Sequence, residues 1–352
     1  MRKLVALSAF LLIACATVSP AQQSAPSTSS TIEKVAEGVY AALQPDDLRF
    51  DDANSAIVIL DDGVLVVDSQ VSPLGARAVI AEIRKLTAKP VRWVVNTHWH
   101  GDHVQGNIAY QEAFPEVVIL AHHNTHRDFL KRTMPMLEED RKAAAAWIER
   151  ASKALQTGEA NGQKLTAEQI EGVKARLGRQ REALRKLEAV TSFAPPNTMF
   201  SGRFYVQRGA AEAVHYAGHT EGDLVVHLPK ARVLVTGDLL DDLPFTGHGS
   251  PRALVATLDK LDALEWDALI PGHGSVRRGR EHLRQVRGLF DAIVTQVDRA
   301  VAEKLSLDDT KKRVDVSAFR PYFVTDDASG RYWGFFVGEA VARAYAEATE
   351  KK

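Results

Sequence analysis

The sequence predicts an α/β protein in which helices are layered against β-sheet. Short β-branched runs alternate with helical stretches from residue 38 onward, a pattern typical of such layers. Apolar residues make up 45% of the 352, which is enough to bury a sizeable core. A formal net charge of −1 argues against a polyanion-binding surface, so nucleic acid is not an expected partner.

The N-terminal segment is expected to be a signal peptide followed by a linker. After a basic start, residues 4–14 form an apolar run of the size of a secretory signal core, too short to cross a bilayer. Cleavage would leave 1–21 as the signal and 22–31 as a polar linker, or it would occur before Cys15, whose context is that of a lipoprotein box. Both cleavage sites predict an exported protein that is periplasmic, outer-membrane-anchored or secreted, with a possible N-terminal lipid as its one contact with a membrane.

Residues 32–350 are predicted to form one domain in which strands and helices alternate. The expected strands are 55–60, 64–68, 91–96, 117–120, 213–216, 224–228, 233–236 and 268–270. The expected helices are 73–87, 104–113, 251–264, 276–305 and a C-terminal helix at about 331–349.

A segment at about 127–190 interrupts this alternation. It is charged and Ala-rich, and its apolar residues recur at three- and four-residue steps. Gly158 to Gly162 is a natural turn in its middle. The segment is therefore expected to be a hairpin of two long helices inserted into the domain, either as a packed decoration or as a lid or dimer surface.

A cluster of metal-capable side chains follows the expected strand 91–96. His98, His100, Asp102 and His103 lie within six residues. His98 and His100 would point to the same side of an extended segment, and the glycine between them and Asp102 allows a turn to a second position. Since Cys15 is the single cysteine, a cysteine-rich metal site is excluded. Three histidines and an aspartate in this spacing favour one loop that serves two adjacent metals.

Three later blocks repeat the order of strand, glycine and ligand-type side chain. They place His219 after 213–216, Asp238 after 233–236 and His273 after 268–270. A lone histidine or Gly-Asp pair is more often structural than a ligand. Ligand sites in α/β sheets, however, gather at the carboxyl ends of strands, so all four loops are expected to converge.

These blocks identify the resemblance: the sequence is similar to the metallo-β-lactamase superfamily from about Glu33 to His282. The family's five blocks are present in order, as Asp68 ending 64–68, HWHGDH at 98–103, His219 in GHT, Asp238 in TGD and His273 in PGHG. The resemblance implies an αββα sandwich, here with the helical hairpin inserted. It also implies a metal-dependent hydrolase.

The resemblance further implies a dinuclear site, with His98, His100 and His219 on the first metal, Asp102, His103 and His273 on the second, and Asp238 bridging them. Two zinc ions suit these nitrogen and oxygen ligands, and iron or manganese is compatible. The two metals would activate a shared water, and Asp102 would help to orient it as it attacks an acyl carbon. Asp68 would orient a ligand imidazole or loop from behind.

The expected substrate is a small acyl compound, either a β-lactam or a lactone or ester. Export fits a β-lactamase, but Asp238, His103 and Asp241 stand where the best-known lactamase subclass carries cysteine, arginine and lysine. Three different functions stay open besides: a thioester hydrolase of glyoxalase II type, a mononuclear iron persulfide dioxygenase, and a non-catalytic periplasmic metal-binding protein. The sequence does not fix the oligomeric state.

Several residues outside these blocks are secondary candidates. His248 follows the Asp238 loop and is a possible substrate contact or a surface residue. Trp99 is expected to pack behind the metal loop. The remaining candidates are a substrate role for Asp51, Asp52 and Asn54, and a second metal site at His122, His123 and His126, for which a structural role is the simpler interpretation.

Overall fold

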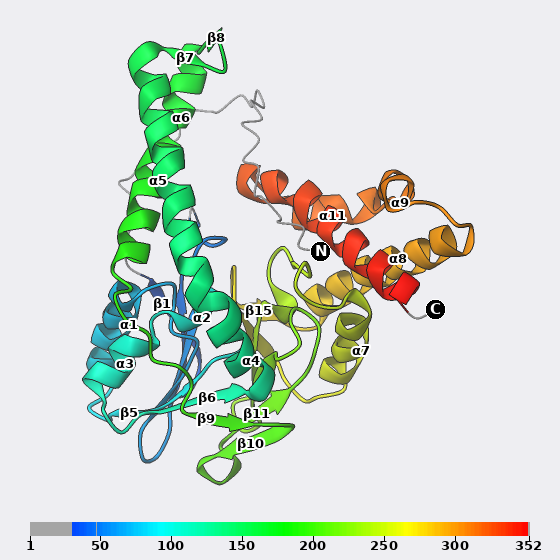
Figure 1. Ribbon diagram of the computed structural model, residues 1–352. Helices are drawn as coiled ribbons and strands as arrows, with labels where there is room; N and C mark the ends of the chain where they lie inside the picture. The colour runs from blue at the N-terminus through cyan, green and yellow to red at the C-terminus, as the bar shows by residue number, and fades with distance from the viewer. Residues whose placement is uncertain (1–29, 47, 351–352) are drawn as a thin grey trace.

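The computed structural model describes residues 30–46 and 48–350 (Figure 1). The expected signal peptide and nearly all of the expected linker lie outside these residues. Two sheets face each other in the described chain, and helices cover the outer face of each. This is the expected αββα sandwich.

The first sheet has seven strands in the order β1-β2-β3-β4-β5-β6-β9. Their bounds are Thr31–Ala36, Val39–Leu43, Ser55–Ile59, Val64–Val67, Val91–Val95, Val118–His122 and Thr198–Phe200. β4, β5, β6 and β9 run parallel, so the loops that follow them open at the same edge. The sequence pattern does not mark β1 and β2, because the exposed polar residues of β1 weaken the strand signal.

The second sheet has six strands in the order β10-β11-β12-β13-β14-β15. Their bounds are Arg203–Val206, Ala211–His215, Leu224–Leu228, Val233–Gly237, Ala268–Pro271 and Arg277–Arg278. β15 corrects the expectation of one helix over 276–305, because Arg277 and Arg278 pair with β14 and Gly279, at φ 70°, turns the chain before the helix begins.

β4 buries both of its faces. In β4, Leu65 and Val67 pack against the second sheet, whereas Val64 and Val66 pack against helices. The outer helices on the first sheet are α1 (Pro73–Leu86) and α3 (Asn107–Ala113), and those on the second are α7 (Pro251–Asp262), α8 (Glu281–Ala302) and α11 (Asp327–Glu350). α9 (Leu307–Arg313) and α10 (Arg320–Phe323) connect α8 to α11.

The inserted hairpin consists of α5 (Met134–Thr157) and α6 (Ala167–Glu188), which stand out from the sandwich in Figure 1. α4 (His123–Asp128) and a π-helical turn (Phe129–Thr133) lead into α5, and the short strands β7 (Glu159–Ala160) and β8 (Gln163–Lys164) close the tip. Gly158 ends α5 in the left-handed conformation, as a C-terminal glycine commonly does. Trp147, Ala151 and Leu177 form a small core between the two helices.

Among the described residues, no helix combines the length and the apolar character needed to cross a membrane.

Candidate metal centre

The metal-capable loop begins where β5 ends. His98 lies in a bend after the strand, and His100 lies on extended backbone. The four-residue helix α2 (Gly101–Val104) starts at the expected turn and carries Asp102 and His103. Buried Asn96 fastens the loop, since its side-chain amide donates to the His103 carbonyl at 3.2 Å and to Asn107 at 3.0 Å. The local sequence therefore presents four side chains to one point above the sheet edge.

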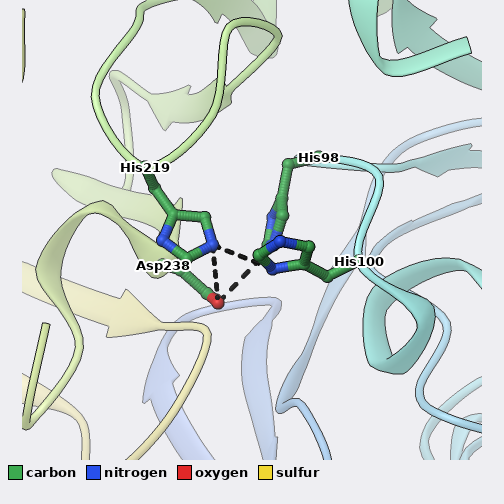
Figure 2. A group of neighbouring side chains, drawn as sticks. All are labelled: His98, His100, His219 and Asp238. Carbon is green, nitrogen blue, oxygen red and sulfur yellow. Dashed lines mark hydrogen bonds and ion pairs between the residues drawn. The ribbon is translucent and has the colours of Figure 1, made fainter. Parts of the chain in front are cut away.

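Loops after β11, β13 and β14 bring the other three predicted ligands to the same place. His98, His100, His219 and Asp238 converge in Figure 2, and their potential ligand atoms lie within 4.8 Å of one another. The His219 Nε2 is 2.9 Å from His100 Nδ1 and 3.3 Å from Asp238 Oδ2. The His98 Nε2 is 3.5 Å from the same carboxylate oxygen.

A second group forms beside the first from Asp102, His103 and His273. The Asp102 Oδ2 lies 3.1 Å from His273 Nε2 and 3.4 Å from His103 Nε2. Asp238 faces both groups, because its other oxygen, Oδ1, is 3.1 Å from His103 Nε2. The structure thus gathers all seven side chains, with one carboxylate between two clusters.

Close approach of Asp238 depends on a neighbouring glycine. A Cβ on Gly272 would lie 2.0 Å from Asp238 Oδ1, so a larger residue would displace the carboxylate. Gly237, just before Asp238, has φ 50°, and a Cβ there would meet Thr97 Oγ1 at 2.5 Å. The Gly-Asp and Pro-Gly-His sequences are therefore required by packing around the shared carboxylate.

Each of the five histidines engages its other ring nitrogen in an outer contact that fixes the ring. These contacts join His98 to Thr97 Oγ1 at 3.0 Å, His100 to His248 Nδ1 at 2.8 Å, His103 to Asp68 Oδ2 at 2.8 Å, His219 to the Phe245 carbonyl at 2.6 Å, and His273 to the Arg49 carbonyl at 2.8 Å. The remaining nitrogens all face the centre.

Asp68 makes three contacts behind the cluster. Besides His103, its carboxylate accepts hydrogen bonds from the Thr97 backbone N–H at 2.8 Å and the Thr97 hydroxyl at 2.7 Å. Asp68 adopts φ 62°, a conformation that aspartate and asparagine tolerate better than most residues. Asp68 therefore holds the imidazole of His103 and the loop that carries it from behind.

The donor set fits metal ions. His98 Nε2, His103 Nε2 and Asp238 Oδ1 are buried and make no hydrogen bond, although the latter two atoms are 3.1 Å apart. Buried polar atoms rarely stay unsatisfied unless an ion or water is their partner. Two donors bound at 2.0–2.1 Å to a tetrahedral zinc lie about 3.3–3.4 Å apart, which matches the separations within each group.

Electrostatics favour cations here. Burial, together with neighbouring imidazoles, lowers the pKa of His98 and His100 well below the ordinary value, so both rings are neutral, as metal binding requires. Burial opposes a charge on His103, but Asp238, Asp102 and Asp68 outweigh it and hold the pKa of that histidine well above its ordinary value. The same carboxylates that stabilise a protonated His103 also favour the binding of divalent cations.

The sequence interpretation missed the role of Asp241 and of two backbone carbonyls. Asp241 lies with Asp238 and His273 in a third group that could hold a metal, and its carboxylate accepts the His273 backbone N–H at 2.9 Å. Burial, and then Asp238, raise the pKa of Asp241 well above its usual range. The position of Asp241 three residues after Asp238, in Gly-Asp-Leu-Leu-Asp, was the sequence signal that could have identified it. The backbone carbonyls of Arg49 and Phe245 have no such signal in the sequence.

The secondary candidates fall in different places. His248 touches the ligand His100 and lines the cavity, while Trp99 is buried as expected and also reaches the cavity wall. Asp51 and Asp52 line the cavity as well. The Asn54 side chain instead holds the ligand loop, donating to the Pro271 and Gly274 carbonyls. His122, His123 and His126 form no group among the described residues in which three ligand atoms converge.

A cavity of about 490 Å³ opens above the metal-ligand cluster. Asp102, with its side chain 22% exposed, and His273 lie at its floor. Its walls come from the 48–52 loop, from α5 and α6, from the 241–248 loop and from α11. The hairpin and the C-terminal helix therefore contribute side chains to the cavity wall.

Known proteins match both the sequence and the fold. The Metallo-beta-lactamase superfamily profile matches residues 48–273. A linear primary-alkylsulfatase from Pseudomonas sp. (strain ATCC 19151) is 27% identical over 313 residues, which cover 80% of this chain and 56% of that protein. The chain thus spans just over half the length of this relative.

Solved structures show the same fold. The sec-alkyl sulfatase PisA1, as a double mutant, superposes with a TM-score of 0.62 and 17% identity, over 91% of this chain and 50% of its own. The metallo-β-lactamase FIM-1 from Pseudomonas aeruginosa, in a mono-zinc form, gives a TM-score of 0.51 and 17% identity over 76% of this chain and 97% of its own. With the profile match over most of the chain and this fold, the protein belongs to the metallo-β-lactamase superfamily.

Proposed function

We propose that this protein uses two zinc ions to hydrolyse uncharged esters or lactones, through attack of water on the acyl carbon of a small substrate. The observation that carries this proposal is the convergence of seven ligand-type side chains, with three buried donor atoms lacking hydrogen bonds, at the floor of an open cavity.

The residues divide the work as follows. His98, His100 and His219 would hold one metal, Asp102, His103 and His273 the other, and Asp238 both. When bound, two such cations lower the pKa of a shared water towards 7 and polarise a carbonyl. Asp102, exposed to the cavity, is placed to accept a hydrogen bond from the attacking water. The outer contacts of the five histidines keep their rings from turning as charge develops.

The charges around the cavity favour an uncharged substrate. Asp51, Asp140 and Glu182 line it together with the ligand carboxylates. Lys186 is the one lysine or arginine among the described lining residues, and it is paired with buried Asp52 at 2.7 Å. β-Lactams and glutathione thioesters carry carboxylates that call for an available cation. A neutral ester or lactone makes no such demand.

Alkyl sulfate hydrolysis is the second candidate. The alkylsulfatase relative supports it, and so does the greater coverage of this chain by the alkylsulfatase structure than by the β-lactamase. A sulfate ester is anionic, so its sulfate group would have to rely on the metals for charge compensation. We rank this candidate second because Lys186 is already paired.

The second group of ligands argues against an iron dioxygenase and against a metal carrier. A mononuclear iron dioxygenase would leave Asp102, His103 and His273 without a purpose, although they converge within reach of one ion. A non-catalytic metal carrier would not need the cavity that opens onto Asp102. A hydrolase with two metals accounts for both features.

We also propose that the protein is exported through its N-terminal signal. The basic start and the apolar run at residues 4–14 support this proposal. Fractionation of cells that express the full chain would test it, with recovery in the cytoplasm alone as the contradicting result.

The deciding experiment is a substrate panel on the full-length, zinc-loaded protein. It would compare 4-nitrophenyl acetate, a γ-lactone, a chromogenic cephalosporin, an alkyl sulfate and a lactoyl glutathione thioester, and would measure zinc and iron by mass spectrometry. We expect the ester or lactone to be hydrolysed fastest, with activity abolished by chelation and restored by Zn²⁺. Faster sulfate release would select the second candidate, and failure on every class with two zinc ions bound would contradict both.

A further inference from the structure

We propose that an arch of aromatic side chains over the metal centre binds an aliphatic hydrocarbon chain of the substrate. The aromatic arch comprises Phe50, Phe245, Tyr332, Phe335 and Phe336, all of which line the cavity. The inference rests on the proposed function, because the chain must belong to an ester whose reacting bond reaches the metal ligands.

The arch is one continuous run of rings. Phe245 lies at its first end, with its ring centroid 6.1 Å from that of the ligand His219, and 5.0 Å from that of Phe336. From Phe336 the run continues to Tyr332 at 5.5 Å and from Tyr332 to Phe50 at 5.2 Å. A chain lying along these rings would start beside one ligand group.

The other end of the arch is tied to the second ligand group. Phe50 follows Arg49, whose carbonyl accepts a hydrogen bond from His273 Nδ1 at 2.8 Å. The arch therefore reaches from the His219 side of the metal centre to the His273 side. If the ester group of a substrate lies at the metal ligands, its hydrocarbon chain can therefore contact aromatic rings on either the His219 side or the His273 side.

α11 supplies the middle of the arch from one helical face. Tyr332, Phe335 and Phe336 occupy positions i, i+3 and i+4, which lie together on a helix. Further along, Val341 and Ala344 are buried against α8 and hold the helix in place. In the first half of the helix, Tyr332 and Phe336 pack against the edge of the same core and also line the cavity, whereas Phe335 lines the cavity without belonging to that core.

Phe335 is the most exposed ring of the arch in the part of the chain that the structure describes. It is 53% exposed, although its ring stacks on Phe245 at 6.0 Å and 18°. Met136 on α5, itself 37% exposed, and Leu187 on α6 line the same cavity. Apolar surface of this kind forms no hydrogen bonds, so an aliphatic chain can bind to it without a fixed orientation. Such a chain would remove the apolar surface from water. Each methylene buried there is expected to raise kcat/KM about fourfold.

A chain-length series tests the inference. The zinc-loaded full-length protein would be assayed on 4-nitrophenyl acetate, butyrate, hexanoate and octanoate. We expect kcat/KM to rise with length, mainly through a lower KM. In Phe335→Ala and Phe336→Ala the octanoate-to-acetate ratio should fall at least about tenfold, and Phe335→Leu should keep part of the rise. Tyr205→Ala is the matched control, since Tyr205 is 57% exposed on β10 and lies outside the cavity lining.

Two outcomes would overturn the arch while leaving the ester hydrolase intact: a wild-type rate independent of chain length, or an unchanged rise in both alanine variants. If no ester is hydrolysed, the proposed function fails on its own, and the arch is then tested by calorimetry with hexanol, octanol and decanol on the zinc-loaded protein. Affinity that grows with length in the wild type, and not in the variants, would support it. Absence of binding would refute it.

Discussion

The metal-ligand cluster at the floor of the cavity is largely buried and is held by hydrogen bonds from behind, whereas the roof, formed by α11 and the hairpin, presents half-exposed apolar side chains. On the floor, each of five histidines has its second ring nitrogen fixed by a partner. On the roof, Phe335 and Met136 leave much of their surface open. The histidine rings of the floor are thus fixed in orientation, while the half-exposed side chains of the roof can change rotamer around a substrate.

The difference separates two tasks. A rigid floor preorganises charge for one kind of reaction, because misplacing a ligand would cost far more than misplacing an apolar contact. The roof is built from the inserted hairpin and the C-terminal helix, which add residues to the cavity without supplying any of the seven predicted ligands. The floor would thus set the chemistry, and the roof would set the substrate.

Removing the shared carboxylate should have the largest effect. Asp238→Ala takes away the one side chain that faces both ligand groups, so we expect activity to fall by about a thousandfold or more and at least one zinc ion to be lost. Steady-state kinetics and metal analysis measure both. Asp259→Ala, which breaks an exposed ion pair on α7, is the control and should change neither. Near-normal activity in Asp238→Ala would show that the reaction does not depend on the ligands at the floor of the cavity.

A buried ion pair anchors the α6 part of the roof to the 48–52 loop of the cavity wall. Lys186 of α6 and Asp52 have side chains only 8% and 2% exposed and lie 2.7 Å apart. Lys186→Met leaves a buried carboxylate unpaired, so the free energy of unfolding should fall by about 3–5 kcal/mol, as seen by denaturant titration. Adding Asp52→Asn should recover much of the loss. If the single substitution costs nothing, α6 is not anchored through this pair.

Asp68 tests the floor from behind. Asp68→Asn retains a residue suited to φ 62° but removes the charge that orients His103. We expect zinc affinity to drop about 10–100-fold, measured by competition with a chelator, with little change in stability. Unaltered affinity would mean that His103 needs no outer carboxylate.

A smaller effect should connect the roof to the floor. Arg49 pairs with Asp326 at 2.6 Å, just before α11, and its carbonyl holds His273. Asp326→Asn weakens this tie, so we expect a few-fold loss in affinity for the zinc held by His273 and an unchanged affinity for the other. Stepwise zinc titration by calorimetry resolves the two. Equal weakening of both would indicate a general loss of stability instead.

Much of the floor could be predicted from sequence because its signals are local. In the three later loops a strand, a glycine and a ligand-type residue follow one another, the first loop carries four such residues within six positions, and parallel strands bring these loops to one edge. The outer contacts were less accessible. Asp68 was found through the family resemblance, whereas the carbonyls of Arg49 and Phe245 have no side-chain signature.

The roof was predictable only in part. The periodicity in 127–190 indicated two helices and their turn. It did not indicate how the hairpin is oriented relative to the sandwich, because that orientation depends on contacts with distant segments. The spacing of Tyr332, Phe335 and Phe336 indicated one face of a helix and not what that face meets. Contacts between segments some ninety or more residues apart, such as Phe245 with Phe335, depend on the complete fold.

The most direct test of the central claim is the zinc content of the saturated, dialysed protein, compared with His219→Ala and His103→Ala. We predict two zinc ions per chain in the wild type and a loss of one in each variant, from different groups of ligands. A wild-type protein that retains one zinc or none, or a His103→Ala variant that still retains two, would contradict the dinuclear centre.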